Sequence, residues 1–68
     1  MAQNTIGIVG LGNMGSGMAQ TLLRHGYEVF GTDVATKQQQ TARKMGVNVV
    51  PDIASLCSQV KVILLSLP

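Results

Sequence analysis

The segment that most restricts the fold of this 68-residue chain is a glycine-rich bend between an apolar run and a long amphipathic segment. The apolar run covers residues 5–9 and leads directly into Gly10-Leu11-Gly12-Asn13-Met14-Gly15. Glycines at this spacing permit a tight turn and close backbone approach, and a helix that begins there offers unpaired N–H groups and a positive partial charge. The order of strand, bend and helix predicts a β-α-β unit whose bend binds a pyrophosphate.

The rest of the chain alternates between helical and strand patterns. We expect helices from about residue 13 to 24, from 36 to 45 and from 53 to 58, and strands over residues 5–9, 27–32, 47–50 and 60–67. Gly26 and Gly46 follow the first two helices and predict left-handed helix ends. Such alternation is typical of an α/β fold with right-handed crossovers. We therefore predict a partial Rossmann-type parallel sheet with strand order 3-2-1-4 and helices on both faces.

Two side-chain patterns predict how the later helices begin. Thr36 is followed three residues later by Gln39, which matches a capping box, so the second helix should not need Asp33 as a cap. Asp52 is the expected N-cap of the third helix.

The soft, apolar side chains are expected in the core. Met14, Met18 and Met45 occur at helical spacing, which is typical of core positions. Cys57 is the only cysteine, so the chain has no internal disulfide or thiolate metal framework, and we expect this residue to be a small buried hydrophobe. We predict no metal site.

Charge and hydropathy exclude several classes of function. The net charge of +2 comes from scattered residues without a basic run, and only two aromatic residues could stack on bases, so we expect no nucleic-acid partner. No apolar stretch reaches membrane-spanning length, and the N-terminus lacks the features of a signal peptide, so we expect no membrane association and a cytoplasmic location. His25, beside Arg24 at a helix end, should complement the helix dipole rather than act in catalysis.

The three glycines of the bend have different expected roles. Gly10 should make the turn, Gly12 should let the backbone reach the pyrophosphate, and Gly15 should let the helix press against the strands. The backbone N–H groups of Asn13 and Met14 are the expected phosphate donors.

Asp33 is the candidate that sets the choice of cofactor. It ends the second predicted strand, 18 residues after Gly15, where a carboxylate can bind the adenosine ribose hydroxyls and repel a 2′-phosphate. No arginine follows it directly, and Lys37 is the nearest cation. The residues therefore favour NAD over NADP.

Residues 10–19, with Leu22-Leu23, residues 26–29 and a final Leu67-Pro68, resemble the N-terminus of the β-hydroxyacid dehydrogenases. This family includes 3-hydroxyisobutyrate dehydrogenase, 2-hydroxy-3-oxopropionate reductase and threonate dehydrogenase-like enzymes, and the resemblance extends over nearly the whole chain. It implies that residues 10–15, Leu11 included, bind the pyrophosphate, that Asp33 binds the ribose, and that Leu67 and Pro68 lie against the cofactor.

Two positions bear on the subfamily. Thr21 replaces an asparagine that is often found at that point of the helix. Phosphogluconate dehydrogenases tend to have an Asn-Arg pair where this chain has Asp33-Val34, which again favours NAD.

The resemblance implies reversible oxidation of a small 3-hydroxy acid by hydride transfer to NAD. The family's substrate-binding and proton-transferring residues lie downstream, so residues 1–68 are expected to be the N-terminal part of an NAD-binding domain without a catalytic residue. We expect this part to fold marginally and to be inactive alone, and the complete enzyme to be a homo-oligomer. Two alternatives are a nucleotide-sensing Rossmann module without catalysis and an NADP-linked reductase of the same superfold.

Overall fold

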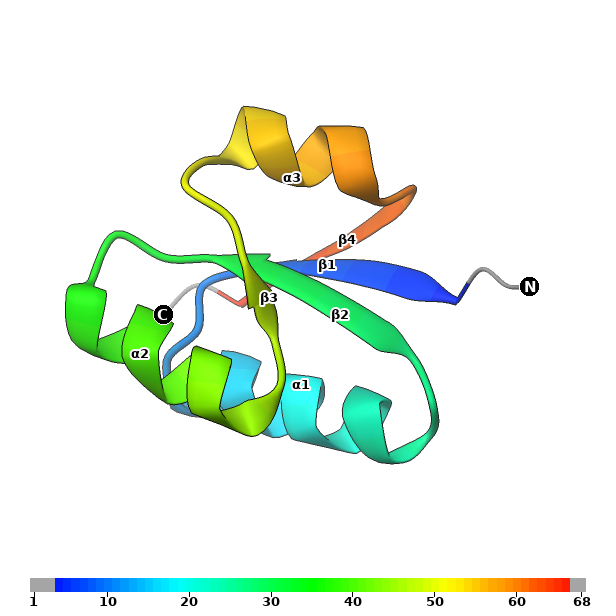
Figure 1. The fold of residues 1–68 in the computed structure, drawn as a ribbon, viewed down its shortest axis with the longest axis horizontal. Coiled ribbons are helices and arrows are strands. Elements are labelled where there is room, and N and C mark those ends of the chain that lie inside the picture. The colour runs from blue at the N-terminus through cyan, green and yellow to red at the C-terminus, as the bar shows by residue number, and fades with distance from the viewer. Residues whose placement is uncertain (1–3, 67–68) are drawn as a thin grey trace.

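The computed structural model describes residues 4–66, which form a parallel sheet flanked by helices (Figure 1). Its elements follow in the order β1 (Thr5–Val9), α1 (Asn13–Arg24), β2 (Glu28–Thr32), α2 (Thr36–Met45), β3 (Asn48–Val49), α3 (Ile53–Gln59) and β4 (Val62–Leu65). The strands lie in the order β3-β2-β1-β4 and each neighbouring pair is parallel. The predicted fold class and strand order are confirmed.

The helices cover both faces of the sheet. Helices α1 and α2 lie on one face and α3 lies on the other (Figure 1). Between the sheet and the first two helices is a core of fully or almost fully buried apolar residues: Ile8, Leu11, Ala19, Val29, Ala42 and Val47. On the opposite face, Leu56 of α3 is fully buried. Burial on both faces explains why β1 and β2 are apolar runs rather than alternating patterns. β4 differs, because its Val62 and Leu65 are exposed although the strand is equally apolar.

Several strands are shorter than predicted because their expected first residues bond to the preceding helix. The N–H of Tyr27 donates to Leu22 O at 3.0 Å, and that of Val47 donates to Ala42 O at 3.0 Å. Likewise, the N–H of Val60 donates to Leu56 O at 3.2 Å, and α3 extends to Gln59. These amides satisfy carbonyl groups at helix ends, so they cannot join the sheet.

The start of α2 differs from the predicted capping box. The N-cap is Ala35, and no side chain caps the helix. The Nε2 atom of Gln39 instead donates to the carbonyl oxygen of Asp33 at 2.6 Å, while Asp33 Oδ1 accepts from the N–H of Ala35 at 2.8 Å. The expectation that Asp33 is not needed at this helix start was wrong, because its carboxylate orders the turn that leads into α2.

Two residues that were expected in the core are exposed. Met14 is 74% exposed because it lies in the first turn of α1, beside the glycine bend, whereas Met18 and Met45 pack against the core as predicted. Cys57 is also exposed: it follows the buried Leu56, and a helix turns about 100° per residue, which carries the thiol away from the sheet. Within residues 4–66, no helix combines the length and apolar character that a membrane crossing requires.

Gly7 permits the close approach of α3 to the sheet, and adding one methyl group there tests this packing. A Cβ at Gly7 would lie 2.8 Å from Val60 Cγ2 and 3.0 Å from Leu56 Cδ1. We predict that Gly7→Ala lowers the free energy of unfolding by about 1–3 kcal/mol, because the overpacked neighbours must move. Chemical denaturation measures the change. Gly17→Ala is the matched control: its added methyl meets nothing within 4 Å, and it should be neutral or stabilising. An equal decrease in the free energy of unfolding in both variants would contradict this account.

The cap of α3 makes a pH-dependent contribution to stability. Asp52 accepts a hydrogen bond from the N–H of Ser55 at 2.8 Å, and the backbone and side-chain hydrogen bonds of Ser55 lower the pKa of Asp52 below its ordinary value of 3.8. A carboxyl group whose pKa is lowered by folding stabilises the protein above its unfolded pKa, and this stabilisation is lost as the pH falls through the folded pKa.

We predict that Asp52→Ala lowers Tm by a few degrees at neutral pH and that the gap to wild type narrows below the ordinary pKa of 3.8. Thermal unfolding across this pH range measures the gap. Asp52→Asn keeps an acceptor oxygen without the charge, so its Tm at neutral pH should fall less than that of Asp52→Ala. A gap that stays constant as the solution is acidified would show that the charge of Asp52 has no part in the cap.

Candidate functional site

The glycine bend is fixed between the carboxyl ends of β2 and β4. The N–H of Gly10 donates to Thr32 O at 3.0 Å, and the N–H of Ser66 donates to Val9 O at 2.8 Å. Gly10 has a φ of 98°, and a Cβ at this position would collide with the carbonyl oxygen of Ser66. Both the left-handed conformation and the neighbouring strand therefore require glycine here, as predicted for the residue that makes the turn.

Gly15 lets α1 pack against the bend. It is buried, and a Cβ here would collide with the carbonyl oxygen of Gly10 and lie 3.3 Å from Ser66 Oγ. The protein's own packing therefore requires glycine at position 15. The predicted role was contact between the helix and the strands, and the contact observed is with the residues just beyond the ends of β1 and β4.

Gly12 differs from both because the protein's own packing does not require it. A Cβ at Gly12 would meet no atom within 4 Å, and its φ of −74° and ψ of −159° are accessible to other residues. The space above its backbone therefore remains open to a group from outside. A ligand that must approach the main chain closely would fit this opening.

The positive end of α1 faces the same opening. Gly12 is the N-cap and has no side-chain cap bond, and the first turn of α1 contains no acidic residue. The first N–H groups of a helix have no intrahelical acceptor, so the amides of Asn13 and Met14 are suited to an anion. The side chain of Ser16 instead stabilises the bend, since its Oγ donates to Leu11 O at 3.0 Å.

Asp33, just beyond β2, is bound by two backbone amides. Its Oδ2 accepts from the N–H of Leu11 at 2.6 Å and its Oδ1 accepts from the N–H of Ala35 at 2.8 Å. The side chain of Leu11 is fully buried in the core. Leu11 was predicted among the cofactor-binding residues, but both its amide and its side chain are engaged within the protein, so its part is to support the bend.

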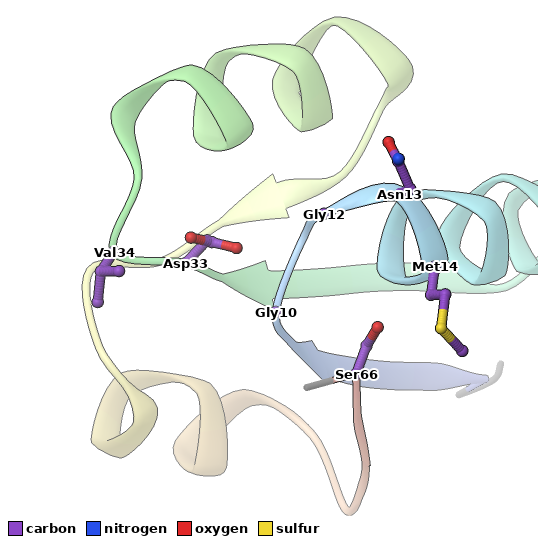
Figure 2. A pocket seen from close by; sticks show the side chains of 7 residues that line it. All are labelled: Gly10, Gly12, Asn13, Met14, Asp33, Val34 and Ser66. Carbon is purple, nitrogen blue, oxygen red and sulfur yellow. The ribbon is translucent and has the colours of Figure 1, made fainter. Parts of the chain in front are cut away.

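These features surround an open pocket with a volume of about 440 Å³, within the range of small-molecule sites. Its lining residues are Gly10, Gly12, Asn13, Met14, Asp33, Val34 and Ser66. Asp33 and Val34 lie on one side of the bend, and Met14 and Ser66 lie on the other (Figure 2). Asp33 is the one charged side chain among these lining residues, opposite the uncapped helix end.

Sequence reasoning placed five of these residues in the site and missed Val34 and Ser66. Ser66 could have been found, since it is the polar residue that interrupts the last apolar run at the same sheet edge as Gly10. Val34 is fully exposed beside Asp33, and its position was considered only in the comparison with the Asn-Arg pair of phosphogluconate dehydrogenases. Leu67 and Pro68 lie outside the described residues.

Other candidate chemistry lies away from this pocket. His25 is the C-cap residue of α1, at the end of the helix opposite Gly12. Across residues 4–66, no three His, Cys, Asp or Glu side chains come together as metal ligands.

Comparison with known proteins identifies relatives over almost the whole chain. Residues 5–68 match the family described as the NAD binding domain of 6-phosphogluconate dehydrogenase. Human mitochondrial 3-hydroxyisobutyrate dehydrogenase is 36% identical over 62 residues, which cover 87% of this chain and 18% of the human protein. An uncharacterised oxidoreductase of Synechocystis is 39% identical over 66 residues, or 94% of this chain and 23% of that protein.

Solved structures agree in fold. The 3-hydroxyisobutyrate dehydrogenase of Mycobacterium tuberculosis with L-serine superposes with a TM-score of 0.91 at 33% identity, covering 98% of this chain and 23% of that one. An imine reductase variant from Myxococcus stipitatus in complex with NAD+ has a TM-score of 0.89 at 18% identity, over 96% of this chain and 23% of that one. The chain thus spans about a fifth of the length of these relatives, and the predicted family resemblance is confirmed.

Proposed function

The chain belongs to the family of NAD-binding domains of 6-phosphogluconate dehydrogenase, and we propose that it holds the pyrophosphate and adenosine ribose of NAD in an enzyme that oxidises a small 3-hydroxy acid or reduces the matching semialdehyde. The open space at Gly12 is the observation that carries this proposal. Gly17 is equally open, but Gly12 is the one of the two that is the N-cap of α1 and lines the pocket, so a ligand bound at the helix end would occupy the place of its missing side chain.

Different residues of the site would bind different parts of NAD. The N–H groups of Asn13 and Met14, at the positive end of α1, would donate to the pyrophosphate above Gly12. Asp33 would accept hydrogen bonds from the ribose hydroxyls. When bound, NAD supplies the hydride acceptor, so these residues contribute binding and orientation rather than proton transfer.

The substrate class rests on the relatives. Both the human protein and the mycobacterial structure are named 3-hydroxyisobutyrate dehydrogenase, at 36% and 33% identity to this chain. The imine reductase is only 18% identical, so it supports the fold and not the substrate. We therefore extend a 3-hydroxy acid substrate to the complete protein as part of the proposal.

The choice of NAD over NADP rests on charge at the end of β2. The Asp33 carboxylate lines the pocket, and its neighbour Val34 is exposed and apolar. A 2′-phosphate at this end of the site would meet a negative charge without a neighbouring guanidinium to compensate it.

Gly12→Val tests the site with only a small expected effect on the stability of the fold. We predict that NADH affinity falls at least about 100-fold, or about 2.7 kcal/mol, because the new side chain fills the approach to the backbone. Fluorescence titration of the complete protein measures the affinity. The variant should still fold, since nothing lies within 4 Å of the added Cβ, although Tm should fall by a few degrees because valine is a poorer N-cap than glycine. Gly17→Val, which is also open to solvent but lies five residues further along α1, should keep NADH binding. Undiminished NADH affinity in Gly12→Val would refute the site.

The cofactor preference is tested separately. We predict that the complete protein binds NADH at least about tenfold more tightly than NADPH, equivalent to about 1.4 kcal/mol, because Asp33 repels the 2′-phosphate. Parallel fluorescence titrations with the two cofactors give the ratio. Tighter binding of NADPH would overturn the assignment of NAD.

A further inference from the structure

We propose that the Asp33 carboxylate is also a positioning residue, which fixes the glycine bend in its binding conformation before the cofactor arrives. This inference rests on the proposed function and assigns Asp33 a second task in the same site. Asp33 then contributes to the binding of the pyrophosphate as well as to the binding of the ribose.

The bond from Leu11 to Asp33 carries the inference. It joins residues 22 positions apart and connects the middle of the bend to the end of β2. Its length of 2.6 Å is at the short end for an N–H···O bond, and an ionised acceptor makes such bonds about twice as strong as neutral ones. The donor belongs to Leu11, the residue directly before Gly12.

Leu11 is anchored on its other side by the core. Its side chain is fully buried, and its Cδ2 lies against the position of Gly31, where an added Cβ would be 2.8 Å away. Apolar packing thus holds the side chain while Asp33 holds the amide. Together they orient the peptide that leads into Gly12 and the first turn of α1.

One further bond orients the carboxylate, and another holds the main chain of Asp33. Oδ1 accepts from the N–H of Ala35 at 2.8 Å, and Gln39 Nε2 donates to the carbonyl oxygen of Asp33 at 2.6 Å. The carboxylate therefore cannot rotate away from Leu11 without losing the Ala35 bond. In this way, the turn before α2 supports the bend before α1.

The carboxylate can perform both tasks at once. An ionised carboxylate has about four acceptor positions, and the two backbone amides use two of them, which leaves two for ribose hydroxyls. An asparagine has a single acceptor oxygen. If that oxygen keeps the local bond to Ala35, the amide group presents a donor to the N–H of Leu11, and the bond to the bend is lost.

The experiment separates the two tasks by removing the ribose hydroxyls from the ligand. NADH and an NADH analogue that lacks the 2′- and 3′-hydroxyls of the adenosine ribose are titrated against the complete wild-type protein, Asp33→Asn and Glu28→Gln. Glu28→Gln removes the same charge from the exposed amino end of the same strand and serves as the matched control. We expect Asp33→Asn to bind the analogue about tenfold more weakly than wild type does, and Glu28→Gln to bind it unchanged.

Hydrogen exchange in the ligand-free protein gives a second readout. In wild type, the Leu11 amide should exchange slowly, and in Asp33→Asn at least about tenfold faster, while the core amides of Ile8 and Val29 keep their protection. Fast exchange of Leu11 in wild type would overturn the inference even if the variant fails to fold.

The outcomes distinguish this inference from the proposed function. Wild-type protein that binds neither NADH nor the analogue would overturn the proposed function and the inference with it. Wild-type and Asp33→Asn proteins that bind the analogue equally, while NADH binding differs, would restrict Asp33 to the ribose and overturn the inference alone.

Discussion

The site depends on the anchoring of one short bend between two parallel strands. β1 pairs with β2 on one side and β4 on the other, so the chain leaving β1 at Gly10 passes between the ends of both neighbours. Gly10 bonds to β2, and Ser66, just beyond β4, bonds back to the last residue of β1. Without parallel pairing on both sides, the bend would have no fixed position and α1 would not present its amino end to a ligand.

The three glycines of the bend are needed for different physical reasons. Gly10 is needed for a left-handed turn beside Ser66, and Gly15 for contact between α1 and the bend. Gly12 faces the open pocket, so its small size leaves room for a ligand without serving the packing of the protein. Stability and binding are therefore divided between neighbouring residues. A Cβ at Gly12 would meet no protein atom within 4 Å, whereas one at Gly10 or Gly15 would collide with a main-chain oxygen.

Most elements and about two thirds of the candidate site could be predicted because their signals are local. Left-handed φ values at Gly26 and Gly46 end α1 and α2 as predicted, and Asp52 caps α3. The predictions that failed concern which side chains are buried by tertiary packing. Met14 has helical spacing but lies in the first turn of α1 beside the open pocket, and Cys57 lies on a helix that buries Leu56 instead. Periodicity identifies a helix face but not whether another layer covers it.

The order of strands and helices, the glycine turn and the acid at the end of β2 were determined by the sequence, because each depends on backbone preferences of a few adjacent residues. The tertiary structure decided what Asp33 does. The pattern of Thr36 and Gln39 suggested that its carboxylate is free, yet the fold brings Leu11 to one oxygen and Ala35 to the other. Leu11 and Asp33 are 22 positions apart in the sequence and meet only because β1 and β2 pair in parallel and end together. A pattern of a few adjacent residues cannot predict such a long-range contact.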